Sequence, residues 1–282
     1  MKILVIGASG FLGREVSQLL ATRGHEVFAT SRAMKAGGIQ IDVTNFRMCE
    51  TVLNEGHYDS VLNLAGCGVT SGSATDVEML AVNFHGAETL AMVISAMSID
   101  SPRLIHVGSS TEPEGTLPGE SPYSESKARG CSAVRNVLSA AHLPFAVARV
   151  HNTYGRHQNE GRFVRAVIAT IQHQETMTIR YPERVRDFCF IDDVAECLVR
   201  TVESTELESS QFEIGTGVGT SLWDTVQFVC EAMGGGEEFF IRADPVESDE
   251  HPEQVANRMS PHFVECKTSL NVGIKSVVGS LR

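Results

Sequence analysis

The chain has 282 residues and a mass of 30.6 kDa, enough for one large domain or two integrated ones with a sizeable core. Hydrophobic residues make up 42% and charged residues 21%, a balance that excludes an intrinsically disordered chain. The net charge of −12 argues against nucleic-acid binding, because that binding depends on Lys and Arg neutralising phosphates.

Short apolar, β-branched runs alternate with helical patterns along the first 150 residues. The runs predict strands at 2–6, 26–30, 60–65, 103–108 and 144–150, and the patterns between them predict helices near 11–23, 44–55, 77–97 and 123–142. Strands joined by helical crossovers form a parallel sheet with helices on both faces. We therefore expect an α/β fold with a doubly wound parallel sheet over residues 1–150, to which about 188–203 also belong.

The pattern becomes looser after residue 150. Helices are predicted near 161–173, 192–203 and 221–233, with short extended pieces near 188–191 and 211–214. Residues 151–282 should form a smaller, mixed α/β C-terminal lobe that binds the substrate.

Cysteine and histidine usage gives no sign of a metal centre. The seven Cys are scattered without a C-x-x-C pair, which favours a reducing compartment over a disulfide framework or a zinc site. None of the ten His belongs to a convincing ligand set, and His106 fits a core strand.

No apolar run approaches the ~20 residues that cross a bilayer, and the start, MKILVIGASG, lacks a signal-peptide pattern. We expect a cytoplasmic protein without a metal or a membrane partner.

The stretch GASGFLG places Gly7, Gly10 and Gly13 directly after the first strand and at the start of the first helix. Glycines at this point allow a sharp turn that brings backbone N–H groups and a helix N-terminus to a pyrophosphate. The position therefore predicts a dinucleotide site, although the G-x-x-G-x-x-G spacing differs from the usual G-x-G-x-x-G.

The end of the second strand indicates which dinucleotide binds. It carries Ser31 and Arg32, and no acid follows until Asp42. An NAD site usually has a carboxylate here for the ribose 2′-OH, whereas Arg binds the 2′-phosphate of NADP. We expect NADP(H), with NAD(H) as the alternative; a solvated loop position for Arg32 is the simpler reading.

Four motifs in order, GASGFLG, NLAG (63–66), GSS (108–110) and YSESK (123–127), resemble the short-chain dehydrogenase/reductase superfamily. The stretches RVHNTYG (149–155) and RVRDFCFIDDVA (184–195) resemble its extended branch of nucleotide-sugar epimerases, dehydratases and reductases. The resemblance covers about 200 residues and implies a Rossmann-like fold. It implies cofactor contacts from Gly7, Ser9, Gly10, Phe11, Leu12, Gly13, Ser31, Arg32, Asp42, Val43, Leu64, Ala65, Gly66, Tyr123 and Lys127.

Tyr123 and Lys127 lie four residues apart, on one face of a predicted helix. A tyrosine that exchanges protons near pH 7 needs a cation that stabilises its phenolate, and Lys127 supplies one. A Ser hydroxyl at the end of the preceding strand would hydrogen-bond the reacting oxygen. The family spacing, counted back from Gly115, selects Ser110 over Ser109, although Glu114 stands where the family has Tyr. The predicted catalytic residues are Ser110, Tyr123 and Lys127.

The segment 149–186 carries seven Arg against three Glu, so its net charge is 7 − 3 = +4 within an acidic chain. A local basic patch suits an anionic small molecule; a solvated basic face is the alternative. The resemblance implies that Asn152 and Arg186 hold the diphosphate of a nucleotide sugar, and that Asn83, Ser109 and Glu112 lie in the substrate site.

Several reactions share this set of residues. The Ser31–Arg32 pair favours an NADPH-dependent 4-ketoreductase of a nucleotide-activated deoxysugar. An epimerase or a 4,6-dehydratase of the same family is the alternative, and the acid–base pair of the dehydratases is here Thr111–Glu112. A non-catalytic NADPH sensor is less favoured, because such relatives usually lack the Tyr–Lys pair.

The predicted helices 77–97 and 123–142 form a dimer interface in the resembled family, so a homodimer is expected. The C-terminus, CKTSLNVGIKSVVGSLR, does not match the L-G-W-x-P ending of the family.

Overall fold

A computed structural model describes residues 1–32, 38–70, 72–97, 101–112, 121–204, 210–244 and 253–281. The chain forms two compact units. Unit 1 contains Met1–Arg149 and Ala195–Phe212, and unit 2 contains Val150–Val194 and Glu213–Arg282. Of the residues 188–203, the part from Ala195 onward lies in unit 1.

One sheet of eight strands dominates the fold. Its order is β14-β10-β6-β5-β4-β1-β2-β3, with bounds Phe263–Glu265, Ser210–Gly215, Phe145–Val150, Arg103–Ser109, Ser60–Asn63, Lys2–Ile6, Glu26–Ser31 and Ile39–Gln40. The pairs β1–β2, β1–β4 and β4–β5 are parallel, with Ile3 opposite both Val27 and Ser60. The chain leaves β1 toward one side and later crosses to the other, so the predicted doubly wound parallel sheet is confirmed.

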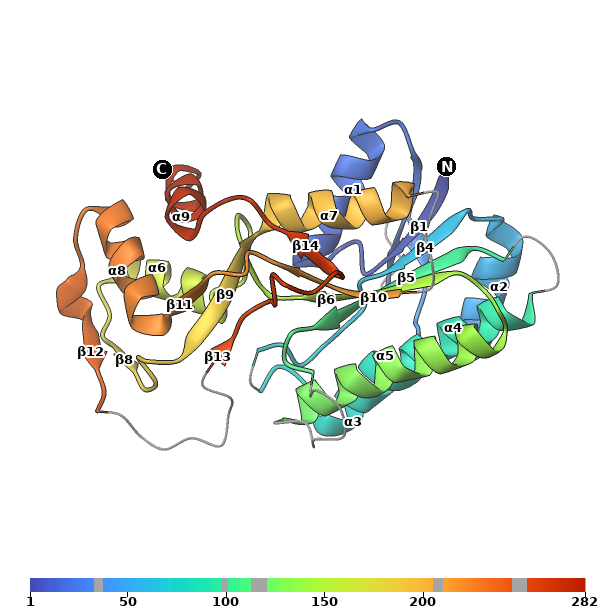
Figure 1. The fold of residues 1–282 in the computed structure, drawn as a ribbon, viewed down its shortest axis with the longest axis horizontal. Helices are drawn as coiled ribbons and strands as arrows, with labels where there is room; N and C mark the ends of the chain where they lie inside the picture. The colour runs from blue at the N-terminus through green and yellow to red at the C-terminus, as the bar shows by residue number, and fades with distance from the viewer. Residues whose placement is uncertain are drawn as a thin grey trace. The chain divides into compact units, whose positions relative to one another are not determined.

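Helices cover both faces of the sheet in unit 1 (Figure 1). One face carries α2 (Phe46–Gly56), α4 (Gly86–Ala96) and α5 (Pro122–Ala140), and the other carries α1 (Phe11–Thr22) and α7 (Ile191–Glu203). Side-chain caps fix two of the helix starts: Asn45 accepts the Met48 N–H at 3.1 Å, and Ser121 accepts the Ser124 N–H at 3.1 Å before Pro122. The main core lies under α2, α4 and α5 and includes Leu4, Leu90, Leu104, Val134 and Leu138.

The helix over Asp76–Ala96 is interrupted in the middle. It begins as α3 (Asp76–Met79), passes through the π-helical segment η1 (Leu80–His85) and continues as α4. Within the described residues it is the one helix long and apolar enough to cross a membrane by length and composition. Core helices pass the same test, and Leu90, Ala91 and Ile94 of this helix are completely buried.

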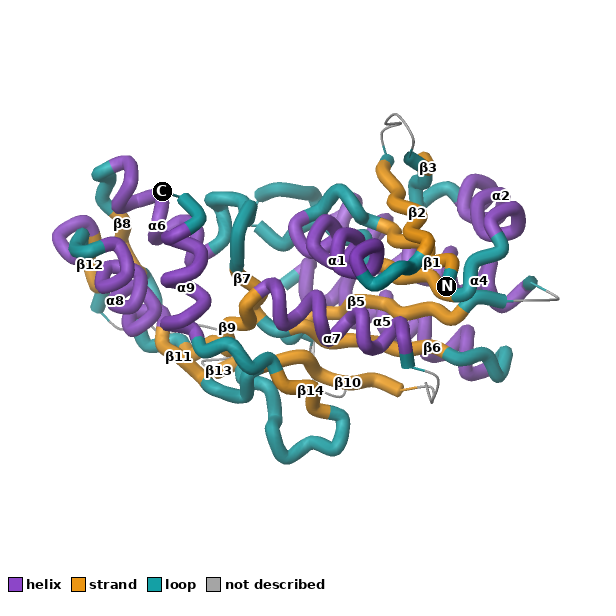
Figure 2. Tube along the Cα trace, turned by 90° about the horizontal axis from the view of Figure 1, so that it is seen from above, coloured by secondary structure: helices purple, strands orange, loops and turns teal. Residues whose placement is uncertain are grey.

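Unit 2 is built on short strands around β9 (Val185–Phe190). This strand pairs with β7 (Asn152–Tyr154), β11 (Gly219–Ser221) and β13 (Glu253–Gln254), while β8 (Met177–Ile179) pairs with β12 (Phe240–Arg242), as Figure 2 shows from above. The helices are α6 (Phe163–His173), α8 (Leu222–Met233), the 3₁₀ turn η2 (Glu237–Phe239) and α9 (Leu270–Gly279). Tyr154 is 1% exposed and its ring contacts Phe188 and Phe190.

Candidate active site

The glycine-rich turn joins β1 to α1 in unit 1. Gly7 has a φ of +83°, and a Cβ at this position would lie 2.9 Å from the backbone carbon of Leu64. A Cβ at Gly13 would collide with the Gly7 carbonyl oxygen, and the Gly10 N–H donates to that oxygen at 3.0 Å. The close approach of Gly7 to residues 64 and 65 brings together two of the segments that the sequence assigned to the cofactor.

The first turn of α1 is open to a ligand. Its N-cap residue, Gly10, has no side chain to accept the first N–H groups of the helix. Ser9 and Gly10 are exposed, and Phe11 and Leu12 are half-buried. Free N–H donors at the start of a helix, next to a turn without side chains, are the features that a pyrophosphate requires.

Arg32 follows β2 with its side chain exposed. Its carbonyl oxygen accepts the Gln40 Nε2 at 3.0 Å, which fixes the backbone at the strand end. Hydrogen bonds from Thr75 hold the pKa of Glu78 below its ordinary value, and the Arg32 guanidinium contributes to the same shift. Arg32 therefore lies in the neighbourhood of α3. Of the residues after Arg32, 33–37 fall outside the described part of the chain.

Asp42 and Val43 follow β3 and lie near the start of α2. The Asp42 Oδ1 accepts the Thr44 N–H at 2.9 Å and the Thr44 hydroxyl at 2.8 Å, so this carboxylate shapes its own turn. Val43 is buried in the main core. Asp42 and Ser31 are both half-buried, and the Ile41 N–H donates to the Ser31 carbonyl oxygen at 3.1 Å.

The turn after β4 is fixed by two buried side chains. The Asn63 Oδ1 accepts the Ala65 N–H at 3.1 Å, and its Nδ2 donates to the His106 Nδ1 at 3.0 Å. His106 is 1% exposed, and burial, with a smaller effect of Lys127, holds the pKa of its imidazole well below the ordinary range. The His106 ring is therefore neutral, which agrees with its predicted place in a core strand.

Asn83 lies at the centre of the π-helical segment and is completely buried. Its Oδ1 accepts the Cys67 N–H at 3.0 Å, and its Nδ2 lies 3.0 Å from both the Cys67 carbonyl oxygen and the Ser126 hydroxyl. The extra residue of a π turn re-aims side chains, and such turns occur often at functional sites. Here the amide ties the loop after Gly66 to α5, next to Lys127.

Ser110 directly follows β5, and Tyr123 and Lys127 lie in the first turns of α5. The Lys127 Nζ donates to the Val107 carbonyl oxygen at 2.5 Å and is 5% exposed as a residue. Ser109 is buried, and its hydroxyl lies 2.9 Å from the Thr111 Oγ1 and accepts the Thr111 N–H at 3.2 Å. Within the described chain, the Ser110 and Tyr123 hydroxyls have no hydrogen-bond partner.

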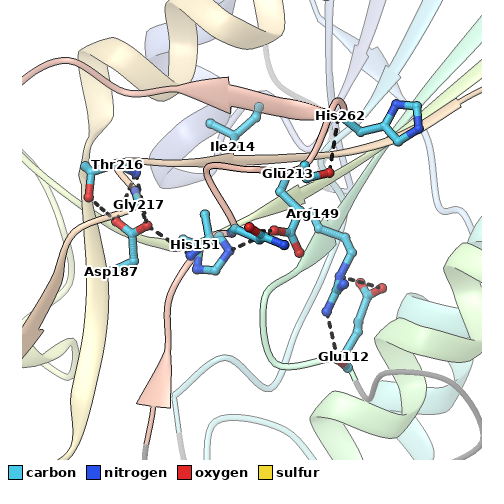
Figure 3. Close-up of polar contacts among 12 residues, drawn as sticks. Glu112, Arg149, His151, Asp187, Glu213, Ile214, Thr216, Gly217 and His262 are labelled. Carbon is cyan, nitrogen blue, oxygen red and sulfur yellow. Dashed lines mark hydrogen bonds and ion pairs between the residues drawn. The ribbon is translucent and has the colours of Figure 1, made fainter.

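Glu112 is buried at 7% exposure beneath the same turn (Figure 3). Its Oε1 accepts the Ser109 N–H at 2.6 Å, and its Oε2 lies 3.8 Å from the Arg149 Nε. The Arg149 Nη2 donates to the Glu112 carbonyl oxygen at 2.8 Å. The sequence predicts that Glu112 contacts the substrate. In the structure its carboxylate faces the Ser109 N–H and the Arg149 guanidinium.

Asn152 and Arg186 lie on adjacent strands of unit 2. Asn152 of β7 is opposite Phe188 of β9, and Arg186 is two residues before Phe188, so the three side chains share one face of the pair. The Asn152 Nδ2 is buried without a hydrogen-bond partner among the described residues. Arg186 is 7% exposed, and its Nη1 donates to the Val185 carbonyl oxygen at 2.8 Å.

A cavity of about 130 Å³ adjoins Asn152. Gln158 lines it as well; the Nε2 of this residue donates to the Thr153 carbonyl oxygen at 2.7 Å, and its buried Oε1 has no partner in the described chain. A donor and an acceptor without partners in one cavity are a feature of a polar ligand site. The remaining lining residues are Thr153, Tyr154, Gly161, Arg162, Phe163, Val164 and Phe188.

Several Arg of the predicted basic patch have partners. Arg156 pairs with Asp192 at 2.8 Å, Arg165 pairs with Glu160 at 3.0 Å, and the Arg184 guanidinium lies 3.6 Å from the centre of the Tyr181 ring. Arg162 is the N-cap residue of α6 and lines the cavity beside Asn152. The charge of the segment is therefore partly neutralised within unit 2.

Sequence reasoning gave no role to Asp187, the completely buried residue between Arg186 and Phe188. Its carboxylate accepts the Gly217 N–H at 2.8 Å, the Thr216 N–H at 3.0 Å and the Thr216 hydroxyl at 2.5 Å (Figure 3). His151, beside Asn152, is also buried, and its Nε2 lies 4.0 Å from the Glu213 Oε2. The acid within R-D-F was visible in the sequence, but its partners lie about thirty and seventy positions away.

A comparison with protein families decides the identity of this fold. Residues 3–215 match the model of the NAD dependent epimerase/dehydratase family. The chain belongs to this family. It is an enzyme of the extended short-chain dehydrogenase/reductase type, as the order of the glycine-rich, Ser, Tyr–Lys and R-D-F motifs predicted.

Individual relatives are distant. The chain is 27% identical to GDP-6-deoxy-D-talose 4-dehydrogenase of Aggregatibacter actinomycetemcomitans, covering 87% of this chain and 86% of that protein. It is 24% identical to dTDP-L-rhamnose 4-epimerase of Burkholderia thailandensis, with 84% and 82% covered. The crystal structure of Thermus thermophilus UDP-glucose 4-epimerase with NAD has a TM-score of 0.83 at 21% identity and covers 99% and 98% of the two chains.

Proposed function

We propose that this enzyme is an NADPH-dependent 4-ketoreductase that acts on a nucleotide-activated deoxysugar. The observation that carries the choice of reductase is Arg32, an exposed guanidinium at the end of β2 where NAD enzymes usually have a carboxylate. An enzyme that selects NADPH consumes it in a net reduction, whereas an epimerase regenerates its cofactor within each turnover.

The residues of unit 1 fit a nicotinamide dinucleotide. The turn at Gly7 and Gly13 leaves no room for a Cβ, and the open N-terminus of α1 suits the pyrophosphate. Arg32 would hold the 2′-phosphate, and Leu64, Ala65 and Gly66 would contact the dinucleotide beside the glycine-rich turn. When bound, NADPH supplies the hydride of the reduction.

The acid–base chemistry falls to Ser110, Tyr123 and Lys127. Ser110 donates a hydrogen bond to the C4 carbonyl oxygen of the sugar, and Tyr123 donates the proton that this oxygen acquires on reduction. The Lys127 ammonium stabilises the tyrosinate that remains. Net addition of one hydride and one proton converts the 4-keto group to a secondary alcohol, and solvent returns a proton to Tyr123.

The choice of Ser110 over Ser109 is supported by their surroundings. The Ser109 hydroxyl is engaged by Thr111, whereas the Ser110 hydroxyl has no partner in the described chain. We expect Ser110→Ala to lower kcat by ~10²-fold, the scale of one lost donor to a developing oxyanion. Ser109→Ala, the matched control, should lower it much less. Equal losses in the two variants would contradict this assignment.

The residues that would bind the diphosphate of the substrate lie in unit 2. Asn152 and Arg186 would hold the diphosphate, since a carboxamide donor and a guanidinium both suit phosphate oxygens. Two curated relatives carry names that refer to chemistry at C4 of a 6-deoxy nucleotide sugar. These names support a nucleotide 4-keto-6-deoxy sugar as the substrate class.

A 4-epimerase is the second candidate, because one of the two relatives is an epimerase. The two functions are separated by following NADPH absorbance with a panel of nucleotide-linked 4-keto-6-deoxyhexoses. A reductase oxidises one equivalent of NADPH per sugar reduced and is purified without tightly held cofactor. Interconversion of two C4 epimers by protein that carries bound NAD, with no NADPH consumed, would overturn the reductase in favour of the epimerase.

A further inference from the structure

The turn from Val107 to Glu112 is held from several sides. The Lys127 Nζ donates to the Val107 carbonyl oxygen, and the Ser124 hydroxyl donates to that of Thr111. The Arg149 guanidinium donates to the carbonyl oxygens of Glu112 at 2.8 Å and Ser109 at 3.5 Å. Ser110 lies in the middle of this turn, and in the proposed reaction its hydroxyl donates a hydrogen bond to the C4 carbonyl oxygen of the sugar.

The Glu112 carboxylate closes this turn from beneath. Its Oε1 accepts the Ser109 N–H at 2.6 Å and the Cys131 thiol at 3.2 Å. Gly108 carries no side chain at the point where the Glu112 Oε1 and the Cys131 Sγ pack against its Cα. The carboxylate therefore spans from β5 to α5.

Three buried groups compensate one another in this cluster. Burial and the Glu112 carboxylate raise the pKa of the Cys131 thiol, so this thiol stays protonated and donates a hydrogen bond to the Glu112 Oε1. Arg149 is 9% exposed, and its Nε faces the Glu112 Oε2 at 3.8 Å. A buried carboxylate without these partners would be strongly destabilising, and so would the buried guanidinium.

We infer that Glu112 is a positioning residue, which fixes the backbone of Ser109 and thereby the place of the Ser110 hydroxyl. This inference rests on the proposed carbonyl chemistry at Ser110. A general base must reach the proton that it removes, but the Glu112 carboxylate is turned onto Gly108, Cys131 and Arg149. In this arrangement Glu112 holds the backbone of the turn and does not serve as the base that takes a ring proton in an elimination of water.

The first test does not depend on activity. Hydrogen–deuterium exchange of peptides that cover residues 103–112 reports on the Ser109 N–H. We expect Glu112→Ala to speed exchange there roughly tenfold or more, because a charge-assisted hydrogen bond is lost. The matched control, Glu50→Gln on the exposed side of α2, should leave these peptides unchanged. Unchanged exchange in Glu112→Ala would overturn the inference. If Glu112→Ala does not fold, Glu112→Ala/Arg149→Met is compared with Arg149→Met, so that the contacts of Arg149 with the turn are lost in both, and faster exchange is expected in the double variant.

The second test compares kinetics. In Glu112→Gln the amide oxygen still accepts the Ser109 N–H, so we expect kcat to fall less than about tenfold with KM nearly unchanged. In the alanine variant we expect kcat to fall by ~10²-fold, the scale of a displaced reacting group. Partial rescue by Gln distinguishes positioning from proton transfer, because a lost general base costs ~10²–10⁴-fold in either variant. A loss of ~10² or more in a folded Glu112→Gln would overturn the inference.

The third test uses deuterated water and the 4-keto nucleotide sugar. A base that acts at the carbon next to the carbonyl exchanges its proton with solvent, and mass spectrometry detects the deuterium. We expect no exchange at this carbon above background. Exchange by the wild type that disappears in Glu112→Gln would overturn the inference. If none of these sugars supports NADPH oxidation, the proposed reductase function is wrong. The inference about Glu112 is still tested in that case by the hydrogen–deuterium exchange of residues 103–112.

Discussion

Replacement of Asp187 by Asn is expected to destabilise unit 2 severely. The completely buried carboxylate accepts N–H groups of Thr216 at 3.0 Å, Gly217 at 2.8 Å and Ala256 at 3.3 Å, and the Thr216 hydroxyl at 2.5 Å. An asparagine keeps the shape but has only one acceptor oxygen. With the amide nitrogen in the place of Oδ2, the Gly217 and Ala256 N–H groups lose their acceptor. With the nitrogen in the place of Oδ1, the three N–H groups share one uncharged oxygen, and the Thr216 hydroxyl must turn from donor to acceptor.

The magnitude follows from these contacts. A hydrogen bond to a charged acceptor contributes about 1.5–3 kcal/mol and one to a neutral acceptor about 0.5–1.5 kcal/mol, so each of the three backbone N–H bonds loses about 1–1.5 kcal/mol. Asp187→Asn should therefore lower the free energy of unfolding of unit 2 by about 3–5 kcal/mol. Asp192→Asn is the matched control, because Asp192 is 47% exposed and pairs with Arg156 at the surface. This control should cost at most about 1 kcal/mol.

The assay is urea unfolding followed by the fluorescence of Trp223, the single Trp of the chain, which lies in α8 of unit 2. The reasoning is refuted if Asp187→Asn loses less than about 1 kcal/mol, or no more than Asp192→Asn. We also expect weaker binding of the nucleotide sugar in Asp187→Asn, since Arg186 precedes Asp187 on β9, with NADPH binding retained in unit 1.

Three further predictions concern the cofactor, the pH dependence of stability and the oligomer. Arg32→Ala should weaken NADPH binding by ~10–100-fold and NADH binding hardly at all, because one charge-assisted phosphate contact is lost. Equal losses of affinity for the two cofactors in a titration would contradict this assignment. Arg47→Ala, at an exposed position of α2, is the control. His106 stays neutral when folded but takes up a proton when unfolded below its ordinary pKa of 6.5, so it lowers stability as pH falls below that value, by up to about 1.4 kcal/mol per pH unit. His106→Asn, whose oxygen can accept from Asn63, should remove this part of the acid destabilisation in urea titrations between pH 5 and 7. An unchanged slope of unfolding free energy against pH would refute this assignment. Light scattering at micromolar concentration should give the mass of a dimer formed through α4 and α5, and a monomer mass would count against it.

The alternation of apolar strands and amphipathic helices was sufficient to predict the fold of unit 1. The predicted strands at 2–6 and 103–108 appear as Lys2–Ile6 and Arg103–Ser109, because strands covered on both faces are apolar throughout. The strands of unit 2 were harder to find. β7, β8, β11 and β12 have three residues each, too few to show any period. The C-terminal helix α9 was missed because its sequence, LNVGIKSVVG, is rich in β-branched residues and Gly, and its stability comes from packing on α8.

The candidate site shows the same division. Motif order predicts Ser110, Tyr123 and Lys127 as catalytic residues, because a glycine turn and a helix cap leave local signals. All three lie in unit 1, directly after β5 and in the first turns of α5. The surroundings of Glu112 and Asp187 left no such signal. Arg149, which donates a hydrogen bond to Glu112, lies thirty-seven positions away in the sequence, and Ala256, which donates one to Asp187, lies sixty-nine positions away. Contacts over such separations depend on the register of strands, which local patterns do not determine.

The central claim is that the Tyr123 hydroxyl passes the proton of the reduction, and Tyr123→Phe tests it most directly. The variant keeps the ring and its packing and removes one oxygen atom. With NADPH and a nucleotide 4-keto sugar, we predict a fall in kcat of ~10²–10⁴-fold, while the Kd values for both ligands change by less than about threefold. Near-wild-type turnover in Tyr123→Phe would contradict the account.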